Sequence, residues 1–468
     1  MSETPATSLE PTIIVIFGIT GDLSQRYLLP SLYHLFQEKI LDGNTQILGL
    51  TRQDMTANDL YDKVELCINE VDNLCDPVAL KAIRTQTELL QFDPEKPEDY
   101  PKLLEKLNAI EAEHGVCMNR LYYLSIPPKL FETTVSNLAT AGLNQSCPHG
   151  VAKTRLLVEK PFGHDLASAQ QLIDHTNAAF QEEQVFRIDH YLAKETIQNI
   201  LVFRAHNPMI ADIWSRQYIN SIDILVSEKI GIENRVSFYE GLGALRDFVQ
   251  SHMMQMLGIV TMELPHELTS DTIHAAKQTL LDAVQPADPA QTVRGQYDTY
   301  KEEVSNPDST TETFVSLHLS IDNDRWRDVP ITLTTGKALL DARRSEITVT
   351  FHSPEDKVAN ALTFRVQPNE GIHFDLQVKK PGYDEQLEKA MLDFSYQEAF
   401  GVNSNHPSAY ERVLVDAIKG DRTLFATSAE VLASWRILEP IIQAWQGNAD
   451  GMQTYATGSD GPLPNLVQ

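Results

Sequence analysis

Cysteine is scarce in this sequence. The 468 residues contain four cysteines, Cys67, Cys75, Cys117 and Cys147, and all of them lie in the first third of the chain. None belongs to a C-x-x-C pair, the spacing that zinc sites commonly use. We therefore expect no metal site, and we expect these four side chains to be buried or unreactive thiols.

Long apolar runs and an excess of basic residues are also missing. A membrane-spanning helix needs about 20 apolar residues, whereas the clean apolar run nearest the N-terminus covers only residues 13–17. Residues 1–11 are polar, unlike a secretory signal. The 38 Lys and Arg against 65 Asp and Glu give a formal net charge of -27, which repels nucleic acid and anionic lipid. We expect a cytoplasmic protein that binds neither nucleic acid nor membranes.

The composition that is present is typical of a large globular protein. Hydrophobic residues make up 42% of the chain and charged residues 22%, which excludes a wholly disordered or fibrous chain. A chain of 468 residues exceeds one ordinary hydrophobic core, so we expect two domains. We place them at residues 1–188 and 189–468, with loose ends at 1–11 and 447–468.

The two predicted domains differ in their patterns. In the first, short β-branched runs alternate with helical patterns, which predicts an α/β, Rossmann-like dinucleotide-binding domain with a parallel sheet. Its expected elements are strands at 12–17, 46–50, 120–125 and 155–158 and a helix at 24–37. Alternating segments in the second predict a larger α+β domain with a mostly antiparallel sheet. These segments are 221–227, 313–321, 331–335, 346–351 and 362–366.

A glycine-containing turn follows the first expected strand directly. Gly18 and Gly21 allow the backbone to approach a pyrophosphate, whose charge the free amides of the following helix can hold. The spacing differs from G-x-G-x-x-G, so a tight turn without a ligand is an alternative. Arg52, after the second expected strand, can pair with a 2′-phosphate, which favours NADP, whereas Asp54 keeps NAD possible.

Three further short segments, called strings below, contain residues suited to ligand binding or catalysis. Lys160 follows the strand at 155–158, at the edge of a parallel sheet where cofactors bind, and its bond to Pro161 is a candidate cis peptide. If the string from Asp189 to Glu195 opens a helix, His190 and Lys194 share a face as a phosphate grip with Tyr191 beside them. The alternative is an exposed helix with Asp189 as its cap.

The third string places His252 in the apolar stripe of a predicted helix at 245–257. A histidine in such a stripe is often a hydrogen-bonded core residue. Beside a cofactor cleft, however, it is also the natural base for removing a hydroxyl proton near neutral pH. The two interpretations differ in what lies next to the imidazole.

Taken in order, these strings resemble the glucose-6-phosphate dehydrogenase family over residues 13–446. The Asp-His-Tyr-Leu-x-Lys-Glu string beginning at Asp189 is the most specific of them, and shorter similarities follow at Ser227-Glu228 and around Lys337. The resemblance implies oxidation of D-glucose 6-phosphate to 6-phospho-D-glucono-1,5-lactone with hydride transfer to NADP+, as in the oxidative pentose phosphate pathway. It also implies a homodimer or homotetramer.

The resemblance further implies residue roles. His252 is the general base that accepts the proton of the anomeric hydroxyl, and Asp189 orients it. The sugar phosphate is held by His190, Tyr191 and Lys194. The sugar hydroxyls are bound by Lys160, Glu228, Asp247 and Lys337. The cofactor is held by Gly18, Ile19, Thr20, Gly21, Asp22, Leu23, Ser24, Gln25, Arg52 and Lys160.

The loop after Lys337 is one residue longer than the family pattern, so the sequence leaves open whether Arg343 or Arg344 contacts substrate. Two alternatives to the implied activity also remain. One is a catalytically weak homologue that binds NADP or sugar phosphate as a partner protein. The other is a dehydrogenase of a different sugar phosphate.

Overall fold

The computed structural model describes residues 9–64, 75–147, 152–340, 344–354, 357–401 and 407–462. The chain forms two compact units, each assembled from three segments. The first unit comprises residues 1–162, 170–193 and 407–428, and the second comprises 163–169, 194–406 and 429–468. In the described residues, no helix combines the length and the apolar character needed to cross a membrane.

The first unit is built on a seven-stranded sheet with the order β15-β6-β5-β4-β1-β2-β3. The interior strand β1, which lies between β4 and β2, consists of six consecutive buried residues, as expected for a strand covered on both faces. Strands β1 to β6 pair in parallel, and β1 to β6 follow the Rossmann order 3-2-1-4-5-6. The strands are β1 (Thr12–Phe17), β2 (Thr45–Thr51), β3 (Thr87–Gln91), β4 (Asn119–Leu124), β5 (Thr154–Val158), β6 (Val185–Ile188) and β15 (Phe425–Ala426).

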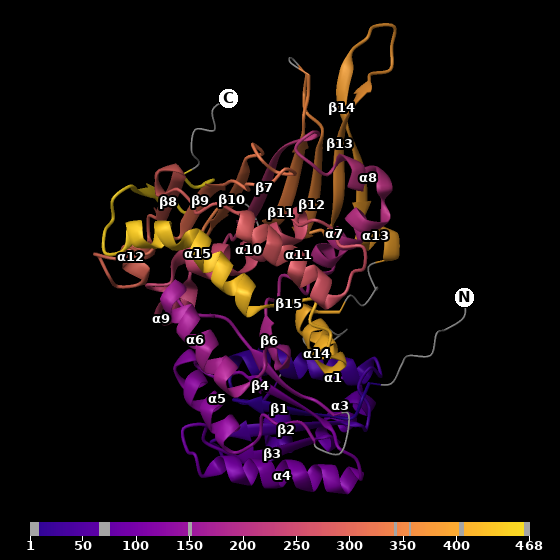
Figure 1. The fold of residues 1–468 in the computed structure, drawn as a ribbon, viewed down its shortest axis with the longest axis vertical. Coiled ribbons are helices and arrows are strands. Elements are labelled where there is room, and N and C mark those ends of the chain that lie inside the picture. Colours follow the sequence, from indigo (N-terminus) through magenta and orange to yellow (C-terminus); the bar gives the residue numbers. More distant parts are fainter. Residues whose placement is uncertain are drawn as a thin grey trace. The chain divides into compact units, whose positions relative to one another are not determined.

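Helices flank this sheet (Figure 1). They are η1 (Ser24–Leu28), α1 (Leu29–Gln37), α2 (Ala57–Tyr61), α3 (Pro77–Thr85), α4 (Asp99–His114), η3 (Pro128–Leu130), α5 (Phe131–Thr140), α6 (Leu166–Ala179), η4 (Glu182–Gln184) and α14 (Ala409–Lys419). The segment η1 is a π-helix that continues directly into α1. The helix predicted at 24–37 is therefore confirmed, as are the four predicted strands, whereas β3 was not predicted.

A segment from late in the chain completes the first unit. Strand β15 pairs antiparallel with the edge strand β6, and Tyr410 of α14 stacks on Tyr27 with ring centroids 5.2 Å apart. The Arg155 side chain donates a hydrogen bond of 2.9 Å to the carbonyl of Ile418 at the end of α14. Residues 407–428 thus belong structurally to the nucleotide-binding fold.

The second unit is built on a nine-stranded sheet with the order β14-β13-β12-β11-β7-β10-β9-β8-β16. Among the strands that the structure describes, β7 pairs in parallel with β10 and β8 with β16, and the other strand pairs of this sheet are antiparallel, so the predicted mostly antiparallel sheet is confirmed. Its strands are β7 (Ile219–Ser227), β8 (Thr292–Tyr297), β9 (Phe314–Leu319), β10 (Ile331–Gly336), β11 (Arg344–Phe351), β12 (Ala361–Gln367), β13 (Gly371–Lys379), β14 (Leu387–Ser395) and β16 (Met452–Tyr455).

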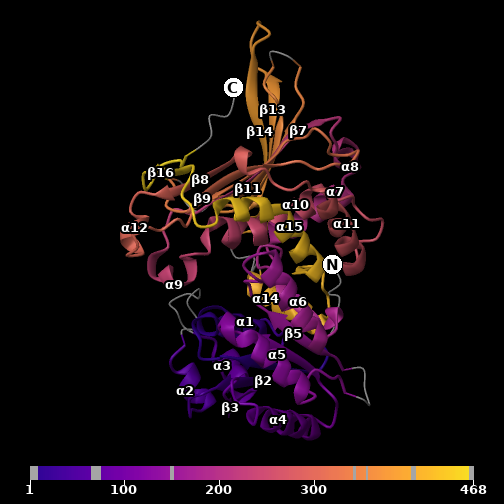
Figure 2. The ribbon, with the colours of Figure 1, turned by 60° about the vertical axis from the view of Figure 1, so that its left-hand side comes forward.

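Helices α10, α11 and α15 lie together on one side of this sheet (Figure 2). The helices of the unit are α7 (Glu195–His206), α8 (Pro208–Ile213), η5 (Glu233–Arg235), α9 (Val236–Tyr239), η6 (Leu245–Met253), α10 (Met254–Thr261), α11 (Ser270–Ala283), η7 (Pro289–Gln291), α12 (Tyr300–Glu303), α13 (Tyr396–Phe400) and α15 (Ser428–Trp445). The predicted loose end at 447–468 is wrong for residues 452–455, because β16 pairs with β8 and Tyr455 is buried. Residues 1–8 and 463–468 of the predicted loose ends lie outside the described residues.

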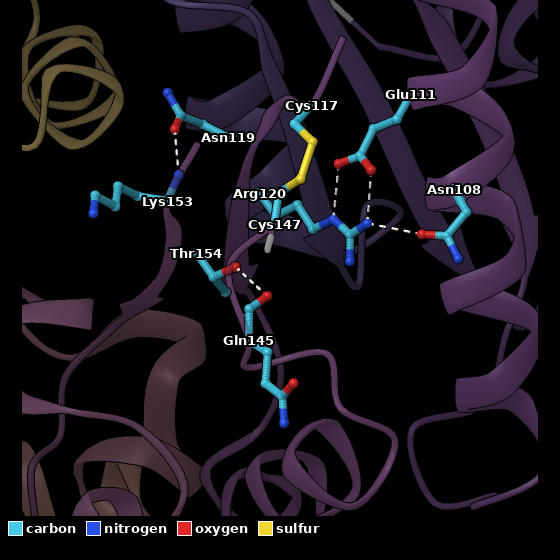
Figure 3. Close-up of a disulfide and its surroundings, with 9 residues drawn as sticks. All are labelled: Asn108, Glu111, Cys117, Asn119, Arg120, Gln145, Cys147, Lys153 and Thr154. Atoms are coloured by element: carbon cyan, nitrogen blue, oxygen red, sulfur yellow. Dashed lines mark hydrogen bonds and ion pairs between the residues drawn. A yellow bond between two sulfur atoms is a disulfide. The ribbon is translucent and has the colours of Figure 1, made fainter. Parts of the chain in front are cut away.

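The expectation of unreactive thiols is also wrong. Cys117 and Cys147 form a disulfide with their Cα atoms 6.2 Å apart, beside the ion pair of Arg120 and Glu111 (Figure 3). Cys75 is disulfide-bonded as well, and Cys67 lies outside the described residues. Cys117 precedes β4 and Cys147 precedes β5, and the parallel pairing of these strands brings their starts together. Their separation of 30 residues gave no sign of this contact.

Candidate active site

A cavity of about 430 Å³ opens at the carboxyl ends of β1, β2 and β4 in the first unit. The strand order reverses between β1 and β4, and such a switch point is where Rossmann folds bind their ligands. Of the predicted cofactor residues, Gly18, Thr20, Gly21 and Arg52 line the cavity. The structure therefore brings these predicted residues together around one cavity.

The glycine turn allows close approach at this switch point. Gly18 has a φ of +76°, and a Cβ atom there would lie 2.4 Å from the carbonyl oxygen of Ser125 after β4. The buried Ser24 hydroxyl donates to the Gly18 carbonyl at 3.0 Å and to the Ser125 hydroxyl at 3.1 Å. Only glycine fits this position, so the turn packs directly against the end of β4 while Gly18 lines the cavity.

The remaining predicted loop residues have different surroundings. Ile19 is buried, whereas Asp22 is exposed and forms an ion pair of 2.8 Å with Arg26. Leu23 is partly buried at the start of the helix, and the Gln25 amide donates to the Thr20 carbonyl at 3.0 Å. Ile19 and Gln25 therefore stabilise the loop from within, whereas Asp22 lies at its surface.

Lys160 follows β5, and its peptide bond to Pro161 is cis, as the sequence suggested. The neighbouring Glu159 is buried and accepts a hydrogen bond of 2.5 Å from the Tyr123 hydroxyl. Burial, with a smaller contribution from the Asp189 charge, raises the pKa of Glu159 to about 7, although the Tyr123 hydrogen bond and the Lys160 charge act in the opposite direction. The first unit thus holds a carboxyl group of raised proton affinity directly beside Lys160.

The string from Asp189 does not open a helix. Residues 190–193 form a turn, and α7 begins at Glu195. The expected shared helical face of His190 and Lys194 is therefore wrong. The turn forms because the Asp189 carboxylate accepts a hydrogen bond of 2.9 Å from the Tyr191 amide, a local bond that competes with helix formation.

The aromatic members of this turn lie together. The rings of His190 and Tyr191 have their centroids 5.2 Å apart, and Tyr191 is fully buried. In the second unit, the Lys194 ammonium donates to the Gln367 side chain at 2.7 Å. Gln367 ends β12 and is not among the predicted site residues.

His252 lies in η6, which is a π-helix rather than the predicted α-helix. The wider turn of a π-helix hydrogen-bonds residues five apart and so brings Asp247 and His252 closer to one face than an α-helix would. Both side chains are buried, and the imidazole meets the Phe248 ring edge-on at 5.5 Å. Short π-helices of this kind often occur at functional sites.

Lys337 and Glu228 form a buried ion pair in the same unit. The Lys337 ammonium also lies 5.1 Å from the centre of the Tyr239 ring and 5.6 Å from that of Phe248, the ring that contacts His252. Glu228, Lys337 and the η6 residues are thus brought to one place, as the sequence predicted. Arg344 pairs with Glu346 at 2.8 Å, and Arg343 lies outside the described residues.

Two buried carboxylates that the sequence analysis missed hold this helical region. Glu312 accepts a hydrogen bond of 2.9 Å from the Leu245 amide at the start of η6. Glu430 of α15 forms an ion pair of 3.0 Å with Lys277 of α11, and Lys277 also donates to Gln255 of α10 at 3.0 Å. An acidic residue in an apolar helical pattern was the available signal for Glu430, whereas Glu312 lies in a polar segment before β9 that gave no signal.

Two family models match the chain in succession. The model for the NAD binding domain of glucose-6-phosphate dehydrogenase matches residues 15–199, and the model for its C-terminal domain matches residues 201–465. The chain belongs to the glucose-6-phosphate dehydrogenase family.

Full-length similarity supports the same assignment. Glucose-6-phosphate 1-dehydrogenase 2 of Mycobacterium tuberculosis is 37% identical over 483 residues, which cover 97% of this chain and 92% of that protein. The Chlamydia muridarum glucose-6-phosphate 1-dehydrogenase is 37% identical over 476 residues, covering 96% and 93%. A glucose-6-phosphate dehydrogenase solved in complex with its substrate glucose-6-phosphate has a TM-score of 0.91 at 31% identity, covering 98% of this chain and 97% of that one.

These similarities confirm the predicted family and fold class. As a glucose-6-phosphate dehydrogenase, the protein is an oxidoreductase that acts on glucose 6-phosphate and combines a Rossmann-like nucleotide-binding domain with a larger, mostly antiparallel one. The roles of individual residues stay predictions.

Proposed function

We propose that the protein oxidises the anomeric carbon of D-glucose 6-phosphate with NADP+ as the preferred acceptor and His252 as the general base. The observation that carries this proposal is the π-helix η6, which sets the buried imidazole of His252 near Asp247 and the Glu228–Lys337 pair. A buried histidine among groups that suit sugar hydroxyls is well placed to accept a hydroxyl proton.

The glycine turn of the first unit fits a dinucleotide. Gly18 lies too close to the Ser125 carbonyl oxygen to carry a Cβ atom, so the turn packs tightly at the end of β4, and Arg52 in the same cavity suits a 2′-phosphate. Bound NADP+ supplies the hydride acceptor. We assign the nucleotide to residues 1–188 and the sugar to residues 189–468, with Lys160 reaching both.

In this mechanism His252 accepts the anomeric hydroxyl proton at an imidazole nitrogen, and Asp189 orients the ring and stabilises the imidazolium that forms. Asp247, Glu228, Lys337 and Lys160 orient the sugar hydroxyls. His190, Tyr191 and Lys194 hold the phosphate. Binding energy from the phosphate, which is remote from the reacting carbon, then fixes the sugar for reaction.

The decisive experiment follows absorbance at 340 nm with glucose 6-phosphate and NADP+ or NAD+, in the wild type, in His252→Asn and in His266→Asn. His266 is an exposed histidine of the same unit and serves as the matched control. We expect His252→Asn to lower kcat roughly 100- to 10,000-fold, the usual contribution of a general base. Equal activity in the two variants would contradict the role of His252.

We further propose a cytoplasmic homo-oligomer, a dimer or a tetramer. The support is the nine-stranded sheet of the second unit, because large antiparallel sheets commonly offer one face to a two-fold partner. Figure 1 shows the long hairpin of β13 and β14 at one edge of this sheet. Its second strand carries exposed apolar side chains at Leu387, Met391 and Leu392.

A further inference from the structure

The guanidinium of Arg52 already has two acidic partners. Its Nη2 atom lies 2.9 Å from an Asp93 carboxylate oxygen and 2.7 Å from a Glu95 carboxylate oxygen. Both carboxylates come from the segment between β3 and α4, and Glu95 lines the cavity together with Arg52. The Arg52 guanidinium, which suits a 2′-phosphate, is therefore already paired with two carboxylates.

Backbone hydrogen bonds fix this acidic segment beside Arg52. The Phe92 amide donates to the Thr51 carbonyl at 2.8 Å, and the Asp93 amide donates to the Asp99 carboxylate at 3.0 Å. The Gln91 side chain donates to the Arg52 carbonyl at 3.3 Å. The segment cannot move away without losing these bonds, so a phosphate must displace the carboxylates by rotating side chains.

The charge balance of the cavity differs for the two cofactors. Its charged lining residues are Arg52, Lys129 and Glu95. A 2′-phosphate brings nearly two negative charges close to Glu95 and competes with it for Arg52. A plain ribose brings a 2′-hydroxyl, which can donate a hydrogen bond to a carboxylate, as in NAD-binding Rossmann folds.

We propose that Glu95, assisted by Asp93, is a specificity-determining residue that weakens the preference for NADP+ and retains the use of NAD+. The carboxylates compete with the 2′-phosphate for Arg52 and accept a hydrogen bond from the unphosphorylated ribose. This inference rests on the proposed function only in taking the cavity as the site of the adenosine ribose.

The test uses two half-ligands, 2′,5′-ADP and 5′-AMP, which differ only in the 2′-phosphate. Their dissociation constants are measured by calorimetry for the wild type, Glu95→Gln and Asp93→Asn/Glu95→Gln. Glu95 and Arg52 have side chains that are 58% and 54% exposed, and an exposed ion pair is worth roughly two- to fivefold in binding. We expect the preference for 2′,5′-ADP over 5′-AMP to rise roughly threefold in the single variant and roughly tenfold in the double variant.

Glu98→Gln is the matched control, because Glu98 is exposed in the same segment at the start of α4. The preference should stay at the wild-type value in this variant. If Glu95→Gln binds both nucleotides with the wild-type preference for 2′,5′-ADP, the role of Glu95 is contradicted, but the assignment of the cavity is not. A reduced preference also overturns it, because the carboxylates would then be preparing Arg52 for phosphate. If neither nucleotide binds the wild type, the assignment of the cavity to the adenosine ribose is contradicted as well. Oxidation of glucose 6-phosphate is measured in a separate assay, so this outcome is distinguishable from a failure of the proposed function.

Discussion

At the scale of single residues, Glu159 is a group whose environment changes its chemistry. Its carboxyl group is buried behind Lys160, and burial raises its pKa from 4.5 to about 7. The folded protein therefore binds this proton more tightly than the unfolded chain does. The resulting stabilisation is complete below pH 4.5 and is lost as the pH rises through about 7.

Glu159→Gln should remove this pH dependence, because glutamine stays neutral. We expect the variant and the wild type to be similarly stable at pH 5, and the variant to be more stable by roughly 3 kcal/mol at pH 8. Urea unfolding across this pH range measures the difference. Glu105→Gln, at an exposed position of α4, is the control, and a stability difference that does not change with pH would refute the role of burial.

Arg52→Ala tests the assignment of the 2′-phosphate. Loss of a charged hydrogen-bond donor should raise the KM for NADP+ roughly 10- to 100-fold and leave the KM for NAD+ within about threefold. Steady-state kinetics with both cofactors give these values. If the two KM values rise equally, Arg52 does not distinguish the cofactors.

Sequence reasoning succeeded where a residue's position in the fold follows from its type and its local sequence. Gly18 and Arg52 were predicted because a turn after a buried strand and the end of the next strand have fixed places in the fold. It could not find Glu95 or Ser125, because these residues reach the cavity only through the pairing of strands far apart in the sequence. Glu159 lay in a string that was singled out, but its proton affinity depends on burial, which the string does not specify.

At the scale of helices and strands, apolar periodicity predicted the strands β1, β2, β4 and β5 of the first unit. It could not distinguish the π-helix η6 from an α-helix, because one extra residue in a turn leaves the short apolar pattern almost unchanged. The turn after Asp189 was mistaken for a possible helix for a related reason. A side-chain hydrogen bond to the Tyr191 amide, rather than helix propensity, decides the structure there.

The packing of α10, α11 and α15 depends on a buried charge cluster. Glu430 contacts Lys277 and His274, at 3.0 Å and 2.9 Å, and both Glu430 and Lys277 are fully buried. Burial alone would raise the pKa of Glu430, but Lys277 and His274 outweigh it and hold this pKa below its usual range. The Glu430 carboxylate is therefore ionised and paired with Lys277.

Lys277→Met should destabilise the second unit by about 3–5 kcal/mol, because it leaves the Glu430 carboxylate without its lysine. In Lys277→Met/Glu430→Leu the buried charge is gone, and most of the lost stability should return. Denaturant unfolding monitored by tryptophan fluorescence measures both, since α15 carries Trp435 and Trp445. A double variant less stable than the single one would contradict this account.

At the scale of the whole molecule, the proposed homo-oligomer makes a direct prediction. Light scattering should give a mass that is two or four times 52.6 kDa. Leu387→Glu/Met391→Glu should shift the mass toward 52.6 kDa, since charges at these exposed apolar positions of β14 oppose association. Val78→Glu, at an exposed apolar position of α3, should leave the mass unchanged. A wild type of 52.6 kDa would refute the proposal.

The late segment 407–428 has a consequence for how the protein is made. The ribosome completes nearly all of the second unit before it supplies β15, the strand that covers the edge of β6. Throughout that interval the growing nucleotide-binding sheet has an open edge, the kind of surface on which nascent chains associate wrongly. Translation that stops before residue 407 therefore yields a chain that retains every residue of the glycine turn but lacks the strand that covers the edge of β6.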